Sequence, residues 1–214
     1  MAKVLLIAEH DGENLNPNTA KCVACAAGIP GAEIDVAVFA ESAGGIAAEA
    51  ASLESVSRVL SSEDAAYRGA LAAVLAPQIV ALADGYDYVL GPSTTFGKDL
   101  MPRVAALLGV NQVSDIMSVE GERTFKRPIY AGSAIVTVEV PADVKVVGTV
   151  RAASYRAVGT GKSAAVESLA MTADVPDHTR FIGSETGKSD RPDLQAAARV
   201  VAGGRALGST DNFD

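Results

Sequence analysis

Residues 88–115 hold the pattern that most limits the possible folds, because a strand, a loop, a helix and a second strand follow one another there without interruption. The apolar run Tyr88–Leu90 stops at a Gly-Pro pair and gives way to a polar loop. Apolar residues then recur with helical spacing until a glycine ends the pattern, and Gln112–Ile116 follows as the second strand. In parallel α/β sheets, ligands bind where loops leave the carboxyl ends of strands. The loop Gly91–Asp99 is therefore the first place to look for a functional site.

Strands and helices alternate in the same way through the first half of the chain. This alternation is typical of βαβ units, so the sequence predicts an α/β fold with a mainly parallel sheet, flanked by helices and joined by right-handed crossovers. The expected strands are Lys3–Glu9, Glu33–Ala40 and Val56–Ser61. The expected helices are residues 18–28, capped by Asn18 or Thr19, and Ile46–Leu53. Asp64–Leu82 is expected to form one long helix, or two helices with Pro77 starting the second.

The pattern changes after Asp115. Three strand-like runs, Thr124–Tyr130, Ser133–Val140 and Val144–Arg151, follow one another with turns and no helix between them. Neighbouring strands that are joined by short turns pair antiparallel. The sequence thus predicts an antiparallel β addition in the second half, either at the edge of the main sheet or folded across it. A further strand is expected at Val166–Thr172.

The last part of the chain has the composition of a boundary between domains. Gly187–Pro192 is polar enough for a linker, and Ala198–Ala202 is an apolar, strand-like run that leads into a glycine turn. A strand followed by such a turn resembles the opening of a new βα unit. We therefore expect an amino-terminal α/β domain over residues 1–190, with residues 191–214 forming a linker and the first strand of a second domain that is otherwise missing.

The composition suits a packed globular domain and argues against some classes of partner. The chain has 214 residues, 49% of them hydrophobic, which is enough for one ordinary domain or for one domain and the start of another. Its formal net charge of -8 argues against nucleic acid and anionic membranes as partners. The amino terminus lacks the pattern of a signal peptide, and no apolar run approaches the length of a membrane span. We expect a cytosolic protein, or one of an organelle matrix after removal of a presequence.

Metal, hydrolytic and redox chemistry find little support in the residues. His10 and His178 are far apart and neither has a metal-ligand spacing, and no Gly-x-Ser-x-Gly motif occurs. We expect no metal site and no catalytic residues. Cys22 and Cys25 form a Cys-x-x-Cys pair, but they lie inside an Ala-rich helical pattern rather than at a helix start. Packing is therefore their favoured role over redox chemistry or metal binding.

The loop Gly91–Asp99 invites comparison with a phosphate-binding P-loop. Walker A has four residues between its first glycine and the Gly-Lys pair, and a Ser or Thr follows the lysine. Here five residues separate Gly91 from Gly97, and Asp99 follows Lys98. A helix amino terminus with free amides can still bind an anion, although Asp99 can equally serve only to stabilise the helix dipole. One hypothesis for the function, kept below as the alternative, is that this is a free-standing nucleotide-binding protein that uses this loop.

Two groups of basic residues need a role. Gly203-Gly204-Arg205 follows an apolar run, and two glycines allow a ligand phosphate to approach the backbone while the arginine supplies a charged contact. A tight turn with a solvated arginine explains this segment equally well. Arg123, Lys126 and Arg127 are expected to form a local ion-pair group rather than a site.

Several segments, in register along the whole chain, resemble the alpha subunit of electron transfer flavoproteins. They are LLIAEHD with LNP (Leu5–Asp11 and Leu15–Pro17), FGKDLMPRVAALLGV (Phe96–Val110), SDI (Ser114–Ile116), TFKRPIYAGSA (Thr124–Ala134), VGTVRAASY (Val147–Tyr155), SDRPDL (Ser189–Leu194) and VVAGGRALGSTDNF (Val200–Phe213).

The resemblance implies a fold and a function. Such alpha subunits have a first α/β domain, of the adenine-nucleotide-hydrolase-like type, and a second domain that binds FAD. They form a heterodimer with a beta subunit of similar fold that carries a structural AMP. The heterodimer takes electrons from flavin dehydrogenases, such as the acyl-CoA dehydrogenases of fatty acid beta-oxidation, and passes them to a membrane quinone oxidoreductase.

The resemblance also implies which residues matter here. The arginine of the Gly-Gly-Arg turn contacts FAD in the family and matches Arg205, so Arg205 with Gly203 and Gly204 are the expected FAD contacts. The family's other FAD-binding elements have no counterpart in this sequence. We therefore expect the 214-residue chain to act mainly as a scaffold that docks the beta subunit, and we expect it to hold no FAD by itself. A bacterial cytoplasm is favoured over a mitochondrial matrix.

Overall fold

The computed structural model describes residues 1–170, 172–185, 194, 197 and 199–213. The chain divides into two compact units, Met1–Gly183 and Ser184–Asp214. The described residues of the second unit contain two short 3-10 turns, η5 (Arg205–Leu207) and η6 (Thr210–Phe213). Among the described residues, no helix is long and apolar enough to cross a membrane.

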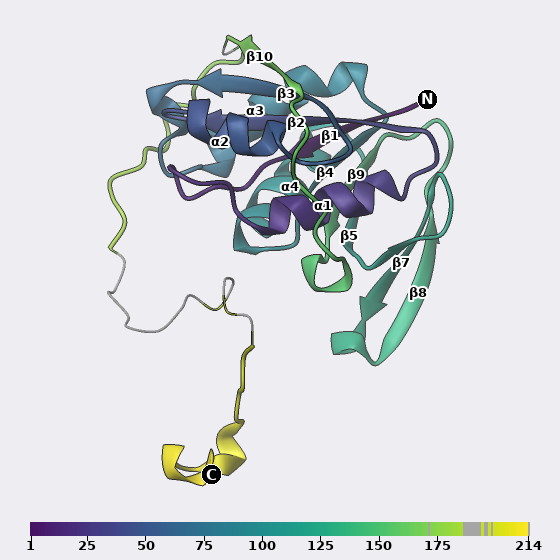
Figure 1. Ribbon diagram of the computed structural model, residues 1–214, viewed down its shortest axis with the longest axis vertical. Coiled ribbons are helices and arrows are strands. Elements are labelled where there is room, and N and C mark those ends of the chain that lie inside the picture. Colours follow the sequence, from purple (N-terminus) through teal and green to yellow (C-terminus); the bar gives the residue numbers. More distant parts are fainter. Residues whose placement is uncertain (171, 186–193, 195–196, 198, 214) are drawn as a thin grey trace. The chain divides into compact units, whose positions relative to one another are not determined.

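A parallel sheet forms the centre of the first unit. In its described residues seven strands lie in the order β10-β3-β2-β1-β4-β9-β5, and every neighbouring pair is parallel (Figure 1). The predicted α/β class with a mainly parallel sheet is confirmed. The strands are β1 (Ala2–Ile7), β2 (Ala32–Ala40), β3 (Val56–Glu63), β4 (Tyr88–Pro92), β5 (Gln112–Ile116), β9 (Val146–Val150) and β10 (Ala165–Leu169).

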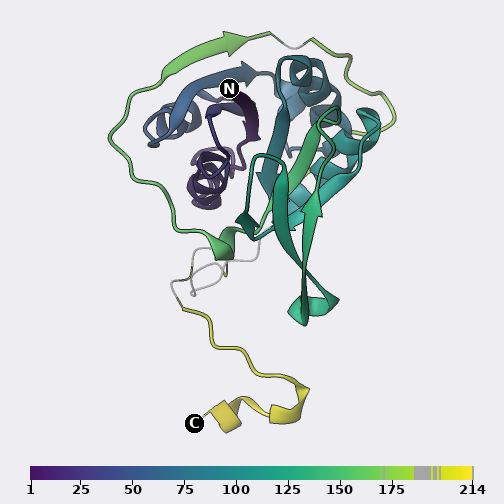
Figure 2. The ribbon, with the colours of Figure 1, turned by 90° about the vertical axis from the view of Figure 1, so that its right-hand side faces the viewer.

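Helices cover both faces of this sheet (Figures 1 and 2). Side chains alternate between the two faces of a strand, so the buried residues form two clusters. One cluster joins α1 and α2 to side chains such as Val36, and the other joins α3 and α4 to side chains such as Leu5. The helices are α1 (Asn18–Ala27), α2 (Gly44–Ala51), α3 (Ala72–Leu82) and α4 (Thr95–Leu107), with 3-10 turns η1 (Ala65–Tyr67), η2 (Ala83–Gly85), η3 (Tyr130–Gly132) and η4 (Ala152–Ser154).

The antiparallel addition is confirmed for two of the three predicted runs. β7 (Thr124–Ile129) and β8 (Ala134–Glu139) pair antiparallel, and the short β6 (Ser118–Val119) adds to the other side of β7. Arg127 ties this small sheet to β5, because its Nε donates to the Ser114 carbonyl at 2.7 Å and its Nη2 to Ser114 Oγ at 2.8 Å.

The prediction for the third run, Val144–Arg151, was wrong. This segment forms β9, which inserts into the main sheet between β4 and β5 and is parallel to both. Side chains hold the returning segment in place: Arg123 donates hydrogen bonds to the carbonyls of Val140 and Val144, and Lys145 donates to the carbonyl of Ala83 at 2.7 Å. All five residues of β9 are buried, and burial without alternation is typical of a central parallel strand.

The predicted start of α1 near Asn18 is confirmed, but its predicted capping residue and the predicted role of Pro77 were wrong. α1 begins at Asn18, so Asn18 and Thr19 lie inside the helix, and Pro17 takes the cap position with φ −56° because its ring fixes a helical φ. Pro77 does not start a second helix but lies inside α3. The break in Asp64–Leu82 falls at Gly69 and Ala70, both of which have positive φ.

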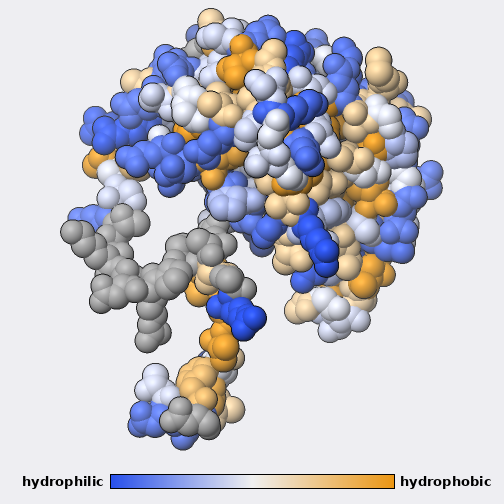
Figure 3. Space-filling model, in the orientation of Figure 1, coloured by the Kyte–Doolittle hydropathy of each residue, from blue (hydrophilic) through white to orange (hydrophobic). Residues whose placement is uncertain are grey.

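The face of the first unit seen in Figure 3 carries polar residues interspersed with apolar ones, which is the ordinary pattern of a solvated surface.

Candidate functional site

The strand order creates a switch point between β1 and β4. From β1 the chain passes through α1 to β2, which lies beside β1 on the side away from β4. From β4 it passes through α4 to β5, which lies in the opposite direction, at the edge of the sheet. In open α/β sheets, the crevice beyond the carboxyl ends of two such strands is the usual place for a ligand. Glu9 follows β1 at this edge, and the loop Gly91–Asp99 begins inside β4 and ends inside α4.

Thr94 bridges the two strand ends at this switch point. It is the N-cap of α4, where its Oγ1 accepts a hydrogen bond from the Gly97 amide at 3.4 Å. The same hydroxyl donates to Glu9 Oε2 at 2.8 Å, a bond between residues 85 positions apart. The neighbouring amide of Ser93 donates to the Val150 carbonyl at 2.8 Å. These polar groups of the loop are therefore bonded to other parts of the protein.

The glycines of this loop serve packing. A Cβ at Gly97 would lie 1.7 Å from the Pro92 carbonyl oxygen, so only glycine allows the first turn of α4 to approach β4 this closely. A Cβ at Gly91 would lie 3.0 Å from the Met101 sulfur. Lys98 and Asp99 are exposed. The glycine spacing that suggested a phosphate loop is thus explained by contact between a helix and a strand.

Glu9 opposes anion binding at the same edge. Its side chain is buried, and this desolvation raises the pKa of its carboxyl, while the hydrogen bond from Thr94 acts in the opposite direction. When this carboxylate is ionised, its charge lies next to the amino terminus of α4, where a phosphate would need to bind, and like charges repel. The contacts of Glu9 and Thr94 therefore favour a closed structural crevice over a nucleotide site.

The Gly203-Gly204-Arg205 turn belongs to the second unit. A Cβ at Gly203 would lie 1.7 Å from Leu207 Cδ1, so this glycine lets Leu207 pack on the backbone, whereas the space beside Gly204 is open. Arg205 is exposed, and among the described residues its guanidinium has no hydrogen bond or ion pair. Of the predicted strand Ala198–Ala202, Ala198 lies outside the described residues, and residues 199–202 are not part of a strand. The strand is thus not formed by these residues here, and its formation as the first strand of a second domain stays a prediction.

The two cysteines lie in the core. Cys22 and Cys25 are fully buried in α1, and desolvation raises the pKa of both thiols, that of Cys25 to about 12. A raised pKa disfavours the thiolate, the form that reacts and binds metals. Among the described residues there is no group of three or more His, Cys, Asp or Glu side chains that could hold a metal ion. His10 donates from Nε2 to the Phe39 carbonyl at 2.8 Å, which is a structural contact.

Among the described residues, the basic cluster forms one ion pair rather than a shared network. Lys126 Nζ lies 2.9 Å from Glu120 Oε2, as the ion-pair prediction expects. Arg123 and Arg127 instead donate to backbone carbonyls. Their role is to hold β7 and the segment before β9 in place.

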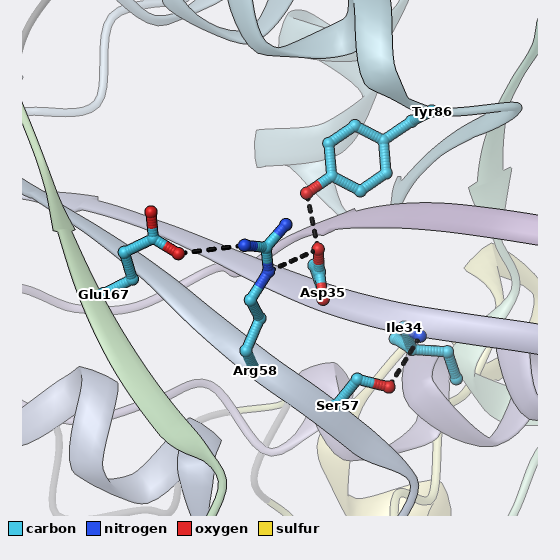
Figure 4. Close-up of polar contacts among 6 residues, drawn as sticks. All are labelled: Ile34, Asp35, Ser57, Arg58, Tyr86 and Glu167. Atoms are coloured by element: carbon cyan, nitrogen blue, oxygen red, sulfur yellow. Dashed lines mark hydrogen bonds and ion pairs between the residues drawn. The ribbon is translucent and has the colours of Figure 1, made fainter.

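Asp35, whose buried carboxylate lies away from the switch point, was not singled out from the sequence (Figure 4). Asp35 Oδ2 accepts hydrogen bonds from Arg58 Nε at 2.9 Å and from the Tyr86 hydroxyl at 2.6 Å, and Arg58 Nη1 also bonds Glu167 Oε2 at 2.9 Å. Burial and this hydrogen bond raise the pKa of the Tyr86 hydroxyl. The group spans β2, β3 and β10 near the amino ends of the strands, so it ties strands together away from the ligand edge. An acidic residue inside the apolar run Ile34–Ala40 was its one signal in the sequence.

Comparison with known proteins gives one consistent result. Residues 4–174 match the family described as "Electron transfer flavoprotein domain". The chain is 47% identical over 211 residues to the electron transfer flavoprotein subunit alpha of Pseudomonas aeruginosa, and 98% of the chain and 67% of that relative are covered. The alpha subunits of Bradyrhizobium diazoefficiens and Paracoccus denitrificans are 48% and 44% identical, again over 98% of the chain and over 66% and 67% of the relatives. The chain thus spans about two thirds of the length of the relatives it matches.

Proposed function

Because this chain belongs to the electron transfer flavoprotein family, we propose that it is part of an alpha subunit, which carries electrons and performs no catalysis of its own. The observation that carries this proposal is the 47% identity to an alpha subunit over 98% of the chain. The alternative, a free-standing nucleotide-binding protein, has no comparable support, since Thr94 and Glu9 already occupy the crevice that it would need.

The two predicted domains, residues 1–190 and 191–214, have different roles in this proposal. Residues 1–190 form the first domain, which serves as a scaffold and docks the beta subunit. Residues 191–214 lead from it into the FAD-binding domain and supply that domain's first strand. The two clusters of buried side chains on either face of the sheet support a scaffold role, because they give residues 1–183 a core of their own.

Arg205 is the proposed FAD contact in this chain, with Gly203 and Gly204 beside it. Its guanidinium is exposed and free of partners among the described residues, and the open space at Gly204 allows a phosphate to approach the backbone. These features fit the phosphates of FAD, but three residues make only one wall of a flavin site. When bound, FAD supplies the capacity to accept and release electrons.

The partners follow from the same proposal. The beta subunit carries AMP, the electron donors are flavin dehydrogenases such as acyl-CoA dehydrogenases, and the acceptor is a quinone oxidoreductase at a membrane. We place the protein in a bacterial cytoplasm because the bacterial relatives are 44% to 48% identical, against 38% for the mitochondrial subunit of Caenorhabditis elegans.

A binding experiment tests both halves of the proposal. The 214-residue chain is mixed with an AMP-loaded beta subunit and passed through a sizing column, and separately it is incubated with FAD and desalted. We expect co-elution with the beta subunit and a colourless desalted chain. The beta subunit incubated with FAD alone is the control for flavin carried by the partner. Failure to co-elute, or one tightly held FAD per isolated chain, would contradict the proposal.

A further inference from the structure

The last segment of the first unit, residues 165–183 apart from Met171, is attached to the body in an unusual way. It begins with β10 at the edge of the sheet, and the chain then passes over to the side of α3 (Figure 2). Four of the five β10 side chains are exposed, as are Val175 and Ile182 farther along. A central strand such as β1 is held by burial, whereas this segment, which we name the strap, buries little apolar surface.

Hydrogen bonds take the place of burial at the start of the strap. β10 pairs with β3 over five residues in parallel register. Among the described residues, the side chains of β10 make one polar link, the ion pair of Glu167 Oε2 with Arg58 Nη1 at 2.9 Å, and both side chains are about half exposed. Exposed ion pairs of this kind contribute little to stability. β10 by itself is therefore weakly held.

The strongest attachment comes from Gln78 in α3. Its amide is buried, with 2% of the residue exposed, yet its three hydrogen bonds to described residues all go to the strap backbone. Nε2 donates to the Ala173 carbonyl at 2.6 Å, and Oε1 accepts from the amides of Thr172 and Ala173, each at 3.0 Å. A buried amide needs its partners, so Gln78 is satisfied only while the strap is in place.

A third attachment lies near the end of the strap. The ring of Phe181 rests on the backbone of Gly69, where a Cβ would fall 2.1 Å from Phe181 Cδ2. Gly69 has φ +75°, a conformation that other residues rarely adopt, so both its backbone and its missing side chain suit this contact. Arg68 lies over the same ring, with Cζ 5.9 Å from the centroid. The close packing of the Phe181 ring thus depends on glycine at position 69.

We propose that the strap opens and closes on the first unit as one piece, with Gln78 as its latch. Segments that combine little buried apolar surface with exposed backbone hydrogen bonds open locally, in contiguous units, before the rest of a protein unfolds. Opening exposes the edge of β3, because β10 leaves it, and it lengthens the chain between the body and the second unit by the length of the strap. Opening and closing of the strap therefore change the length of the chain that connects the body to the second unit.

Hydrogen exchange on the 214-residue chain, read by mass spectrometry, tests the proposal. Gln78→Leu removes the latch but keeps the size of the side chain, and we expect amide exchange in residues 165–169 to become at least about tenfold faster while β1 stays protected. Phe181→Ala removes a contact at the other end of the strap and should speed exchange in the same β10 amides. Ile182→Ala is the matched control, because its side chain is 88% exposed, and it should leave exchange unchanged.

Faster exchange confined to residues 172–173 in Gln78→Leu would overturn the proposal, since the strap would then not move as one piece. Unchanged β10 exchange in Phe181→Ala would do the same, even if Gln78→Leu proved too unstable to study.

Discussion

Two glycine turns with a nearby cation, one at the switch point and one in the second unit, differ in whether their polar groups are already bonded. At the switch point, Gly97 is required for packing against Pro92, and Thr94 and Glu9 bond each other. In the second unit, the guanidinium of Arg205 has no partner among the described residues and the space beside Gly204 is open. A glycine-rich turn can therefore hold a ligand only when its polar groups are not already used by the fold.

The largest expected effect is at Gly97. In Gly97→Ala the added Cβ meets the Pro92 carbonyl oxygen at 1.7 Å, which is backbone and cannot rotate away. We expect the free energy of unfolding to fall by about 3 kcal/mol, as for severe overpacking. Urea unfolding of the 214-residue chain measures it. Gly85→Ala, where a Cβ meets nothing within 4 Å, is the control and should lie within about 0.5 kcal/mol of the wild type. Equal stability of the two variants would show that Gly97 is not a packing residue.

The second effect concerns binding rather than stability. Arg205→Ala in the complete heterodimer should weaken FAD binding by about 2 kcal/mol, the usual loss when a hydrogen bond to a charged group is removed. Unfolding of the 214-residue chain should not change, because the Arg205 side chain has no partner among its described residues. Lys98→Ala is the matched control, since it removes the cation of the switch-point turn. The comparison fails if Lys98→Ala weakens FAD binding as much as Arg205→Ala does.

Thr94 should have a smaller effect, on stability alone. Thr94→Val keeps the shape of the side chain but removes the cap of α4 and the donor to Glu9. We expect a loss of about 1 to 2 kcal/mol in urea unfolding. Thr94→Ser retains the hydroxyl and should recover most of the loss. If Thr94→Ser is as unstable as Thr94→Val, the methyl group rather than the hydroxyl holds the crevice closed.

The smallest effect depends on pH. Burial raises the pKa of Glu9 in the folded protein above its ordinary value of 4.5, so the folded state holds this proton more tightly than the unfolded state. The stability that Glu9 contributes is therefore full below about pH 4.5 and is lost as the pH rises through the folded pKa. Glu9→Gln does not titrate, so its stability relative to the wild type should increase from pH 4 to pH 7. A relative stability that stays constant or decreases over this range would contradict the burial argument.

Local patterns in the sequence were sufficient for most of the first unit. Both bounds of β5, Gln112–Ile116, match the prediction, because the glycine turn after α4 marks where the strand begins. β9 was misplaced because no helix precedes it, although its three valines do not alternate with exposed residues as in a half-exposed strand. The hydrogen bond between Thr94 and Glu9 could not be predicted, since the two residues are 85 positions apart and no local sequence pattern links them.

The direct test of the contrast between the two turns is a calorimetric titration of the 214-residue chain with AMP. With its crevice closed by Thr94 and Glu9, the switch-point turn should give no heat of binding. Stoichiometric AMP binding that is lost in Lys98→Ala would contradict this account, because it would place a working nucleotide site in the loop Gly91–Asp99.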